Sequence, residues 1–226
     1  MSEAGAVGLG ALNDLGRTYF RRRYTILFYT LVFTVVASPA IASLGLSGAL
    51  IESLLAANLL AAVMPVNAGR SRSFLLAVMT AVWLARPATA WLGHPVLSAI
   101  TLGTWTLIGL FAAAVALRFA MGGTKVDTEH LCAALSAYLL AGIYFGLLYW
   151  VLEQIRPGTL IAATSISRTG AVYFSFVTLA TLGYGDIVPR TDVARGLAIV
   201  EGVGGQLFLA VLVARLLSLY SKPAGD

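Results

Sequence analysis

The amino-acid sequence predicts an all-α membrane protein with six transmembrane helices, a short re-entrant helix and an irregular loop. Of the 226 residues, 59% are hydrophobic and only 11% are charged, and the mean hydropathy is +0.87. A soluble domain cannot bury that much apolar surface. The apolar residues form six long runs, and the 38 residues between the last two runs, 154–191, are broken by Gly and Pro. No stretch has the composition of a second, soluble domain.

The apolar runs are each roughly 20 residues or longer, which is the length that a membrane-spanning helix needs. We predict spans at residues 24–44, 48–66, 73–92, 95–120, 131–153 and 192–220. The second and third runs are interrupted by polar residues. Segment 154–191 is too short and too irregular to span twice, so we predict that it enters the membrane and returns on the same side. Such backbone is tolerated at membrane depth only where protein or water covers it.

Basic residues set the predicted orientation. The net charge is +5, and Lys and Arg gather at the ends of the apolar runs, as in a membrane protein and unlike a nucleic-acid binder. Six spans place both termini on one side, and ten of the 15 basic residues fall there: Arg17, Arg21, Arg22, Arg23, Arg70, Arg72, Arg118, Lys125, Arg215 and Lys222. Five fall on the other side: Arg86, Arg156, Arg168, Arg190 and Arg195. The termini are therefore predicted to be cytoplasmic, and the re-entrant segment to enter from outside.

The re-entrant segment carries the main concentration of chemistry, the run Thr-Leu-Gly-Tyr-Gly-Asp at 181–186. It follows a short apolar and aromatic helix predicted at 171–180. A cation that crosses a membrane must exchange its water shell for protein oxygens, which backbone carbonyls supply when successive residues alternate in handedness. Gly183 and Gly185 permit this alternation because glycine lacks a Cβ. The run therefore predicts a cation-binding loop.

The other residues of this loop also suit that chemistry. Thr181 can offer a hydroxyl as well as its carbonyl at the inner mouth, and the ring of Tyr184 can pack sideways and hold the diameter of a pore. Asp186 can accept a hydrogen bond behind the loop. The preceding helix points the negative end of its dipole at the cavity in which a cation would wait.

Two runs, 173–189 (YFSFVTLATLGYGDIVP) and 205–215 (GQLFLAVLVAR), carry a resemblance to a known family. Residues 131–220 resemble the pore module of the tetrameric potassium channels, with its outer helix, pore helix, selectivity filter and inner helix. The resemblance implies potassium selectivity and a homotetramer around one central pore. It also implies an ion-binding filter in which backbone carbonyls hold K+: Thr181, Leu182, Gly183 and Tyr184, with Gly185 completing the segment.

The pore helix departs from the family at two positions. Ala180 stands where many relatives have a second threonine. Val177 stands where some bacterial channels have a glutamate that hydrogen-bonds the filter aspartate. Asp186 must then find another donor, and Tyr173 is the candidate for this filter support.

The last helix carries three further predictions. Gly205 lies where related channels have a bending point, which implies a gating hinge, although close packing against the pore helix explains a glycine equally well. At about 100° per residue, one face would line a water-filled cavity: Gln206, Ala210, Val213, Ala214 and Leu217. Glu201 points away from that face, toward the pore helix or a neighbouring chain, where it supports the filter. A carboxyl at that depth needs a partner, and it acts either as a hydrogen-bonded strut or as a proton sensor.

The first four spans, within residues 24–120, occupy the position of a voltage sensor. A sensor needs several positive charges along its fourth helix, because each charge gains only about 2.3 kcal/mol per 100 mV. The fourth span offers Arg118 alone, at its cytoplasmic end. We therefore expect no conventional voltage gating.

Polar residues within the spans give further expectations. Glu52 and Arg86 lie at nearly matching depths in antiparallel helices, which predicts a static ion pair. Asn58 is expected to make an interhelical hydrogen bond. Asp127 and Glu129 open the fifth span, where an N-cap and acidic residues are favourable.

The sequence thus predicts a passive potassium channel. Its parts are a cytoplasmic tail (1–23), a four-helix transmembrane domain without gating charges (24–120), a cytoplasmic linker (121–130), the pore domain (131–220) and a short cytoplasmic tail (221–226). Its partners are other copies of itself and the lipids of a prokaryotic cell membrane, with no nucleic acid and no appended ligand-binding domain. K+ is the permeant ion and no cofactor is expected.

Other functions stay open at this stage. The alternatives are an ion-translocating subunit of a potassium transport complex and a subunit that modulates another channel. No nucleophile–base pair, phosphate loop or redox motif points to an enzyme. The stimulus that opens the pore is left undecided between pH, membrane tension, lipid and gating at the filter.

Overall fold

The computed structural model describes residues 22–44, 48–63, 70–91, 95–122 and 127–220. In this part of the chain there are seven helices and two short strands: α2 (Arg23–Ser43), α3 (Gly48–Val63), α4 (Arg70–Trp91), α5 (Pro95–Ala120), α6 (Thr128–Ile155), β1 (Leu160–Ala162), α7 (Arg168–Leu179), β2 (Ile187–Pro189) and α8 (Asp192–Tyr220). Residues 1–21 of the predicted N-terminal tail, residues 123–126 of the predicted linker and the predicted C-terminal tail lie outside the described residues.

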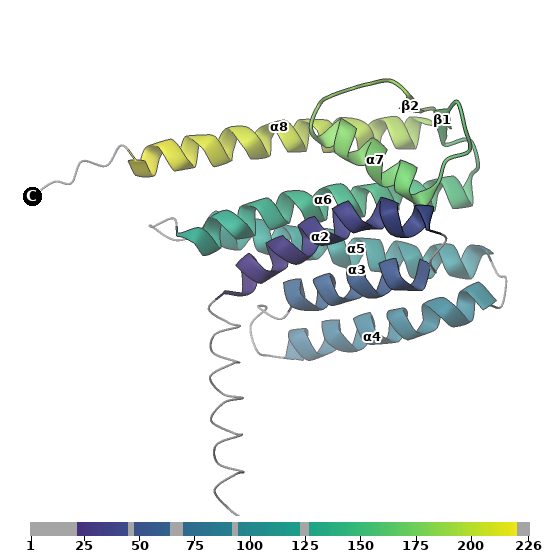
Figure 1. Cartoon of the computed structure of the whole chain (residues 1–226), viewed down its shortest axis with the longest axis horizontal. Coiled ribbons are helices and arrows are strands. Elements are labelled where there is room, and N and C mark those ends of the chain that lie inside the picture. The colour runs from purple at the N-terminus through teal and green to yellow at the C-terminus, as the bar shows by residue number, and fades with distance from the viewer. Residues whose placement is uncertain (1–21, 45–47, 64–69, 92–94, 123–126, 221–226) are drawn as a thin grey trace, which may run out of the picture.

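Six long helices lie lengthwise beside one another, and the short helix α7 is tilted near one end of α8 (Figure 1). The predicted helices are confirmed at all these positions, with ends within three residues of those expected. Four of the described helices are long and apolar enough to cross a membrane: α2, α5, α6 and α8. The apolar parts of α3 and α4 are shorter, so their crossing of the membrane stays a prediction.

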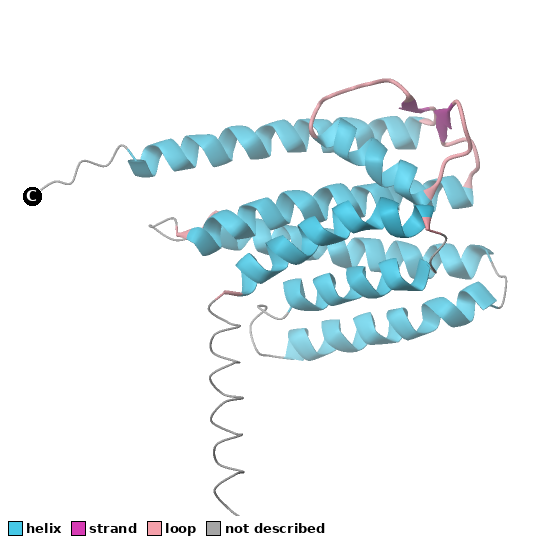
Figure 2. Cartoon of the chain, viewed as in Figure 1, coloured by secondary structure: helices cyan, strands magenta, loops and turns pink. Residues whose placement is uncertain are grey.

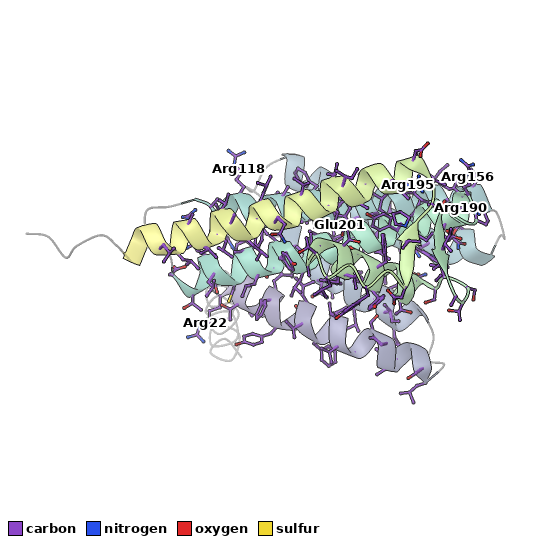
Figure 3. All side chains as sticks on the ribbon, turned by 90° about the horizontal axis from the view of Figure 1, so that it is seen from above. Arg22, Arg118, Arg156, Arg190, Arg195 and Glu201 are labelled. Carbon is purple, nitrogen blue, oxygen red and sulfur yellow. The ribbon has the colours of Figure 1, made fainter. Side chains whose placement is uncertain are left out.

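The arginine side chains labelled in Figure 3 lie toward the two ends of the bundle. Figure 3 shows Arg156, Arg190 and Arg195 at one end and Arg22 and Arg118 toward the other. The two strands and the long loops gather at the first of these ends (Figure 2). The membrane orientation inferred from the basic residues stays a prediction.

Helix α6 begins where the sequence supplies a cap. The Asp127 side chain accepts a hydrogen bond from the backbone N–H of His130 at 3.0 Å, which confirms the expected N-cap. The His130 ring lies 2.7 Å from the same carboxylate oxygen, and this hydrogen bond lowers the pKa of Asp127 below its ordinary value.

Glu129 caps a different helix. Its carboxylate accepts the backbone N–H groups of Tyr24 at 3.0 Å and Thr25 at 3.2 Å, in the first turn of α2. These N–H groups have no partner within their own helix, so the carboxylate satisfies them and complements the helix dipole. The start of α2 is therefore attached to the start of α6.

One hydrophobic core runs through the first five long helices, and α5 and α6 form its most extensive helix pair. The pair is close because Gly109 of α5 lies under the ring of Tyr144, where an added Cβ would be only 2.3 Å from ring carbons. The core thus joins the four-helix part to the outer helix of the predicted pore.

A cluster of three charged residues links α3 and α4 to α7. Glu52 accepts hydrogen bonds from Arg86 Nη2 at 2.6 Å and Nε at 3.2 Å, which confirms the predicted ion pair. Arg168, in the first turn of α7, adds a third contact through Nη1 at 3.1 Å. Asn58 donates to Thr34 of α2 at 2.7 Å, so its predicted interhelical hydrogen bond is also confirmed.

A small antiparallel sheet frames the loop that follows α7. Leu160 of β1 pairs with Pro189 of β2, and Ala162 with Ile187. Glu153 fixes the preceding turn because its carboxylate accepts the backbone N–H groups of Gly158 at 2.8 Å and Leu160 at 2.9 Å. Three-residue strands leave too little pattern for sequence reasoning, which did not predict them.

Candidate functional site

Helix α7 directly precedes the predicted filter in the chain and positions its first residues. Ser167 caps its start by accepting the N–H of Gly170 at 3.0 Å. At its end, Thr181 N–H donates to the Thr178 carbonyl at 3.0 Å, and Leu182 N–H donates to the Val177 carbonyl at 2.9 Å. The helix therefore ends in a tight, hydrogen-bonded turn directly before the Gly-Tyr-Gly run.

The backbone then alternates in handedness, as the glycine spacing predicted. Thr181 (φ 55°), Gly183 (φ 61°) and Gly185 (φ 77°) have positive φ, whereas Leu182 and Tyr184 do not. Glycine accepts this conformation at little cost, but threonine does not. Thr181 is thus a strained position, and such positions concentrate at functional sites.

The carbonyl groups of this run are free to bind a ligand. Within the described residues, no hydrogen bond involves the backbone carbonyls of residues 181–184. All residues from 181 to 186 are also exposed in the single chain, with Leu182 at 56% and Tyr184 at 66%. Unsatisfied carbonyls at membrane depth are costly, so this surface requires cations, water or further chains.

Helix α8 contacts the first residue of the predicted filter. Gln206 of α8 donates from Nε2 to the hydroxyl of Thr181 at 2.9 Å. The predicted cavity-lining residues all lie on exposed parts of α8: Gln206, Ala210, Val213, Ala214 and Leu217. Sequence reasoning placed Gln206 on this face but did not foresee its bond to Thr181.

Asp186, at the end of the predicted filter, interacts electrostatically with Tyr173 of α7. A hydrogen bond from the Tyr173 hydroxyl to Asp186, expected because Val177 stands where some channels have a glutamate, stays a prediction, as does its effect on filter stability.

Glu201 lies behind the filter and is only 1% exposed. It points toward α7 and α6, in agreement with its predicted direction away from the cavity face. Tyr149 of α6 donates to its Oε2 at 2.8 Å, and its Oε1 contacts the hydroxyl of Ser175 in α7. The Ser175 hydroxyl also lies 2.7 Å from the carbonyl oxygen of Gly142 in α6. Sequence reasoning missed Tyr149 and Ser175, although polar residues in apolar helices were a signal for them.

Three glycines let the other helices approach α7 closely. A Cβ added at Gly146 would be 2.4 Å from Val172 Cα, and one added at Gly142 would be 2.5 Å from the Phe176 ring. At Gly205 of α8, an added Cβ would be 2.3 Å from the Leu179 carbonyl oxygen. This contact supports the close-packing interpretation of Gly205; its role as a gating hinge stays a prediction.

Comparisons with known proteins agree with this geometry. The family described as "Ion channel" matches residues 133–222. The chain is 34% identical over 90 residues to the inward rectifier potassium channel Kirbac3.1 of Paramagnetospirillum magnetotacticum, an alignment covering 38% of this chain and 28% of that protein. It is 50% identical over 48 residues to two-pore potassium channel 4 of Arabidopsis thaliana, covering 21% of this chain and 17% of that protein. No solved structure matches the chain significantly.

The short helix α7, the loop of free carbonyls and the flanking apolar helices agree with the ion channel domain that the family match assigns to residues 133–222. The matches share that domain, and the chain spans less than a third of the length of either relative. Residues 133–222 match the ion channel family, and the two relatives that share part of their sequence with this chain are potassium channels.

Proposed function

We propose that the protein is a potassium-selective channel whose pore is formed by four identical chains. The observation that carries this proposal is the row of carbonyls at 181–184. They accept no hydrogen bond in the described chain, and φ is positive at every second residue from 181 to 185. Such a row replaces the water shell of K+ when several copies face one axis. The ligands are the carbonyls of residues 181–184, with Gly185 completing the segment.

The exposed surface of α8 supports assembly of several chains. In the apolar stretch of α8 only 11% is buried within the chain, whereas in the apolar stretch of α6 the buried share is 61%. One re-entrant loop supplies only one wall of a pore, so other copies must supply the rest. Four copies follow the organisation of the tetrameric channels that the filter resembles, with the cavity face of α8 turned toward the axis.

Conduction in this proposal does not depend on a conventional voltage sensor. Residues 24–120 form the four-helix domain and residues 131–220 the pore domain. Arg118 is the one basic residue of α5, in its last turn. The ion pair between Glu52 and Arg86 is in direct contact and partly buried, which suits a fixed link between two helices and not a moving gating charge. The protein lies in the cell membrane among lipids, with both termini cytoplasmic.

Purified protein in liposomes tests the proposal through K+ flux, with Na+ as the comparison ion. We expect K+ flux to exceed Na+ flux, and native mass measurements to give four copies. Gly183→Ala should abolish K+ selectivity because Gly183 has φ +61°, which strains any residue with a Cβ. Gly196→Ala is the matched control, since its added Cβ meets nothing within 4 Å and its φ is not positive.

Two results contradict the proposal. Absence of K+ flux from correctly assembled wild-type protein excludes a channel formed by this chain alone. Equal K+ and Na+ flux, unchanged in Gly183→Ala, excludes the carbonyl row as the selective element.

A further inference from the structure

The buried carboxyl of Glu201 lies where three pore-domain helices meet. It belongs to α8, contacts α6 through Tyr149 and contacts α7 through Ser175. Figure 3 shows Glu201 nearer the middle of the bundle than Arg156, Arg190 and Arg195. Among the described residues, no basic side chain hydrogen-bonds or pairs with it. An unpaired carboxylate in such a place is costly, so its protonation state decides how this junction is held.

Counting protons at Ser175 decides that state. A serine hydroxyl has one proton to donate and two lone pairs that accept. The Ser175 oxygen lies 2.7 Å from the Gly142 carbonyl oxygen, which can only accept, so the serine proton points there. The same oxygen contacts Glu201 Oε1. With the serine proton already used, this second contact is a hydrogen bond only when Glu201 supplies the proton.

The other carboxyl oxygen completes the network. Tyr149 donates its phenolic proton to Oε2 at 2.8 Å. The directed chain is then Tyr149 to Glu201, Glu201 to Ser175, and Ser175 to the Gly142 carbonyl. Each of the three contacts has a proton of its own only if Glu201 is a neutral carboxylic acid.

We propose that Glu201 carries a proton that fixes the pore helix α7 between the outer helix α6 and the inner helix α8, and that its removal at alkaline pH lowers K+ conduction. The second part rests on the proposed channel function. Besides Tyr149, the titratable side chain that interacts with Glu201 is Tyr138, also from α6. The group that faces it from α7 is the hydroxyl of Ser175, which does not titrate in this range.

Loss of the proton leaves one donor too few. Hydroxide removes it from Oε1, and Ser175 must then donate either to the carboxylate or to the Gly142 carbonyl. A charged acceptor makes the stronger bond, so the serine turns and the carbonyl loses its side-chain donor. The pore helix is thereby released from α6 at Ser175, six residues before the strained Thr181. Filter geometry depends on this helix, so conduction should fall.

The test combines K+ flux in liposomes with infrared spectroscopy of the same purified protein. Wild-type flux should fall roughly tenfold from acid to alkaline pH, the effect expected from loss of one buried hydrogen bond. Glu201→Gln should keep its acid-pH flux throughout, because the amide donates to Ser175 and accepts from Tyr149 without titrating. Asp192→Asn is the matched control, since this carboxyl on the same helix is fully exposed and should leave the wild-type profile unchanged.

The infrared spectrum reports the proton without relying on conduction. At neutral pH the wild type should show the C=O stretch of a buried carboxylic acid, which disappears at alkaline pH and is absent in Glu201→Gln. Absence of that band in the wild type overturns the proposal even if the protein conducts. If the band is present but no K+ flux is measured, the protonated state of Glu201 is supported and the channel function is rejected. Identical flux profiles in wild type and Glu201→Gln, or flux that rises at alkaline pH, overturn the coupling to conduction.

Discussion

Replacement of Gly205 by alanine separates the two interpretations of this glycine. The added Cβ would lie 2.3 Å from the Leu179 carbonyl oxygen and 3.2 Å from the carbonyl carbon, where ordinary contact begins at 3.4 Å. The two helices must therefore separate by about 1 Å at this point (3.4 − 2.3 Å). The obstacle is backbone, which cannot rotate aside as a side chain can.

The size of the effect follows from two opposing terms. Overpacking costs about 1–3 kcal/mol, and a rigid backbone obstacle places this site in the upper half of that range. Alanine gains about 1 kcal/mol of helix propensity over glycine. The net result should be a loss of about 1–2 kcal/mol per chain. Because Leu179 ends α7, the displacement also reaches the filter and should reduce K+ flux.

Thermal unfolding of the purified protein in detergent, followed by the liposome flux assay, measures both effects. Gly204→Ala is the matched control: its added Cβ meets nothing within 4 Å in the chain, so it gains helix propensity without a clash. Gly205→Pro distinguishes the two interpretations further. If Gly205 is a hinge, the bend that proline introduces should favour conduction. If Gly205 is needed for packing, the proline Cβ clashes with Leu179 and conduction should fall. The packing argument is refuted if Gly205→Ala unfolds at or above the wild-type temperature, or if Gly205→Pro conducts better than wild type.

Two further substitutions test the supports at the outer end. Tyr173→Phe removes the hydroxyl that is predicted to donate to Asp186, so K+ currents should decay faster during sustained recording. An unchanged decay rate would show that Asp186 is held in another way. Glu52→Gln leaves Arg86 and Arg168 facing each other without their shared carboxylate. The expected loss of unfolding free energy is about 2–3 kcal/mol, below the value for a fully buried pair because Glu52 is 26% exposed. An unfolding temperature equal to that of wild type would contradict this estimate.

Sequence reasoning succeeded where a single helix or a short run fixes the geometry. The depths of Glu52 and Arg86 follow from the rise per residue, and their pairing was predictable from that alone. The alternating backbone of the filter follows from the glycine spacing. The direction of Glu201 follows from its angle on the helix relative to Gln206.

Contacts between distant segments were beyond that reasoning. Arg168 joins Glu52 from 116 residues away, and the offset between those segments depends on how α7 tilts against α6. Glu129 was expected to favour its own helix and instead caps α2, because the two helix starts lie side by side. The close packing of Gly205 against α7 could be seen only from the position of the Leu179 carbonyl, which no local pattern contains.

Two acidic residues join the first four helices to α6 and α7, at opposite ends of the molecule. Glu129 attaches the first turn of α2 to the start of α6, and Glu52 attaches α3 and α4 to the first turn of α7 through Arg168. Because these two attachments involve different helices and lie at separate places, the first four helices as a group cannot swing on a single pivot. If lateral pressure in the bilayer tilts α3 or α4, either the contact between Glu52 and Arg168 breaks or α7 is pulled with them. The four helices would then serve the filter as a mechanical lever, loaded by the membrane itself.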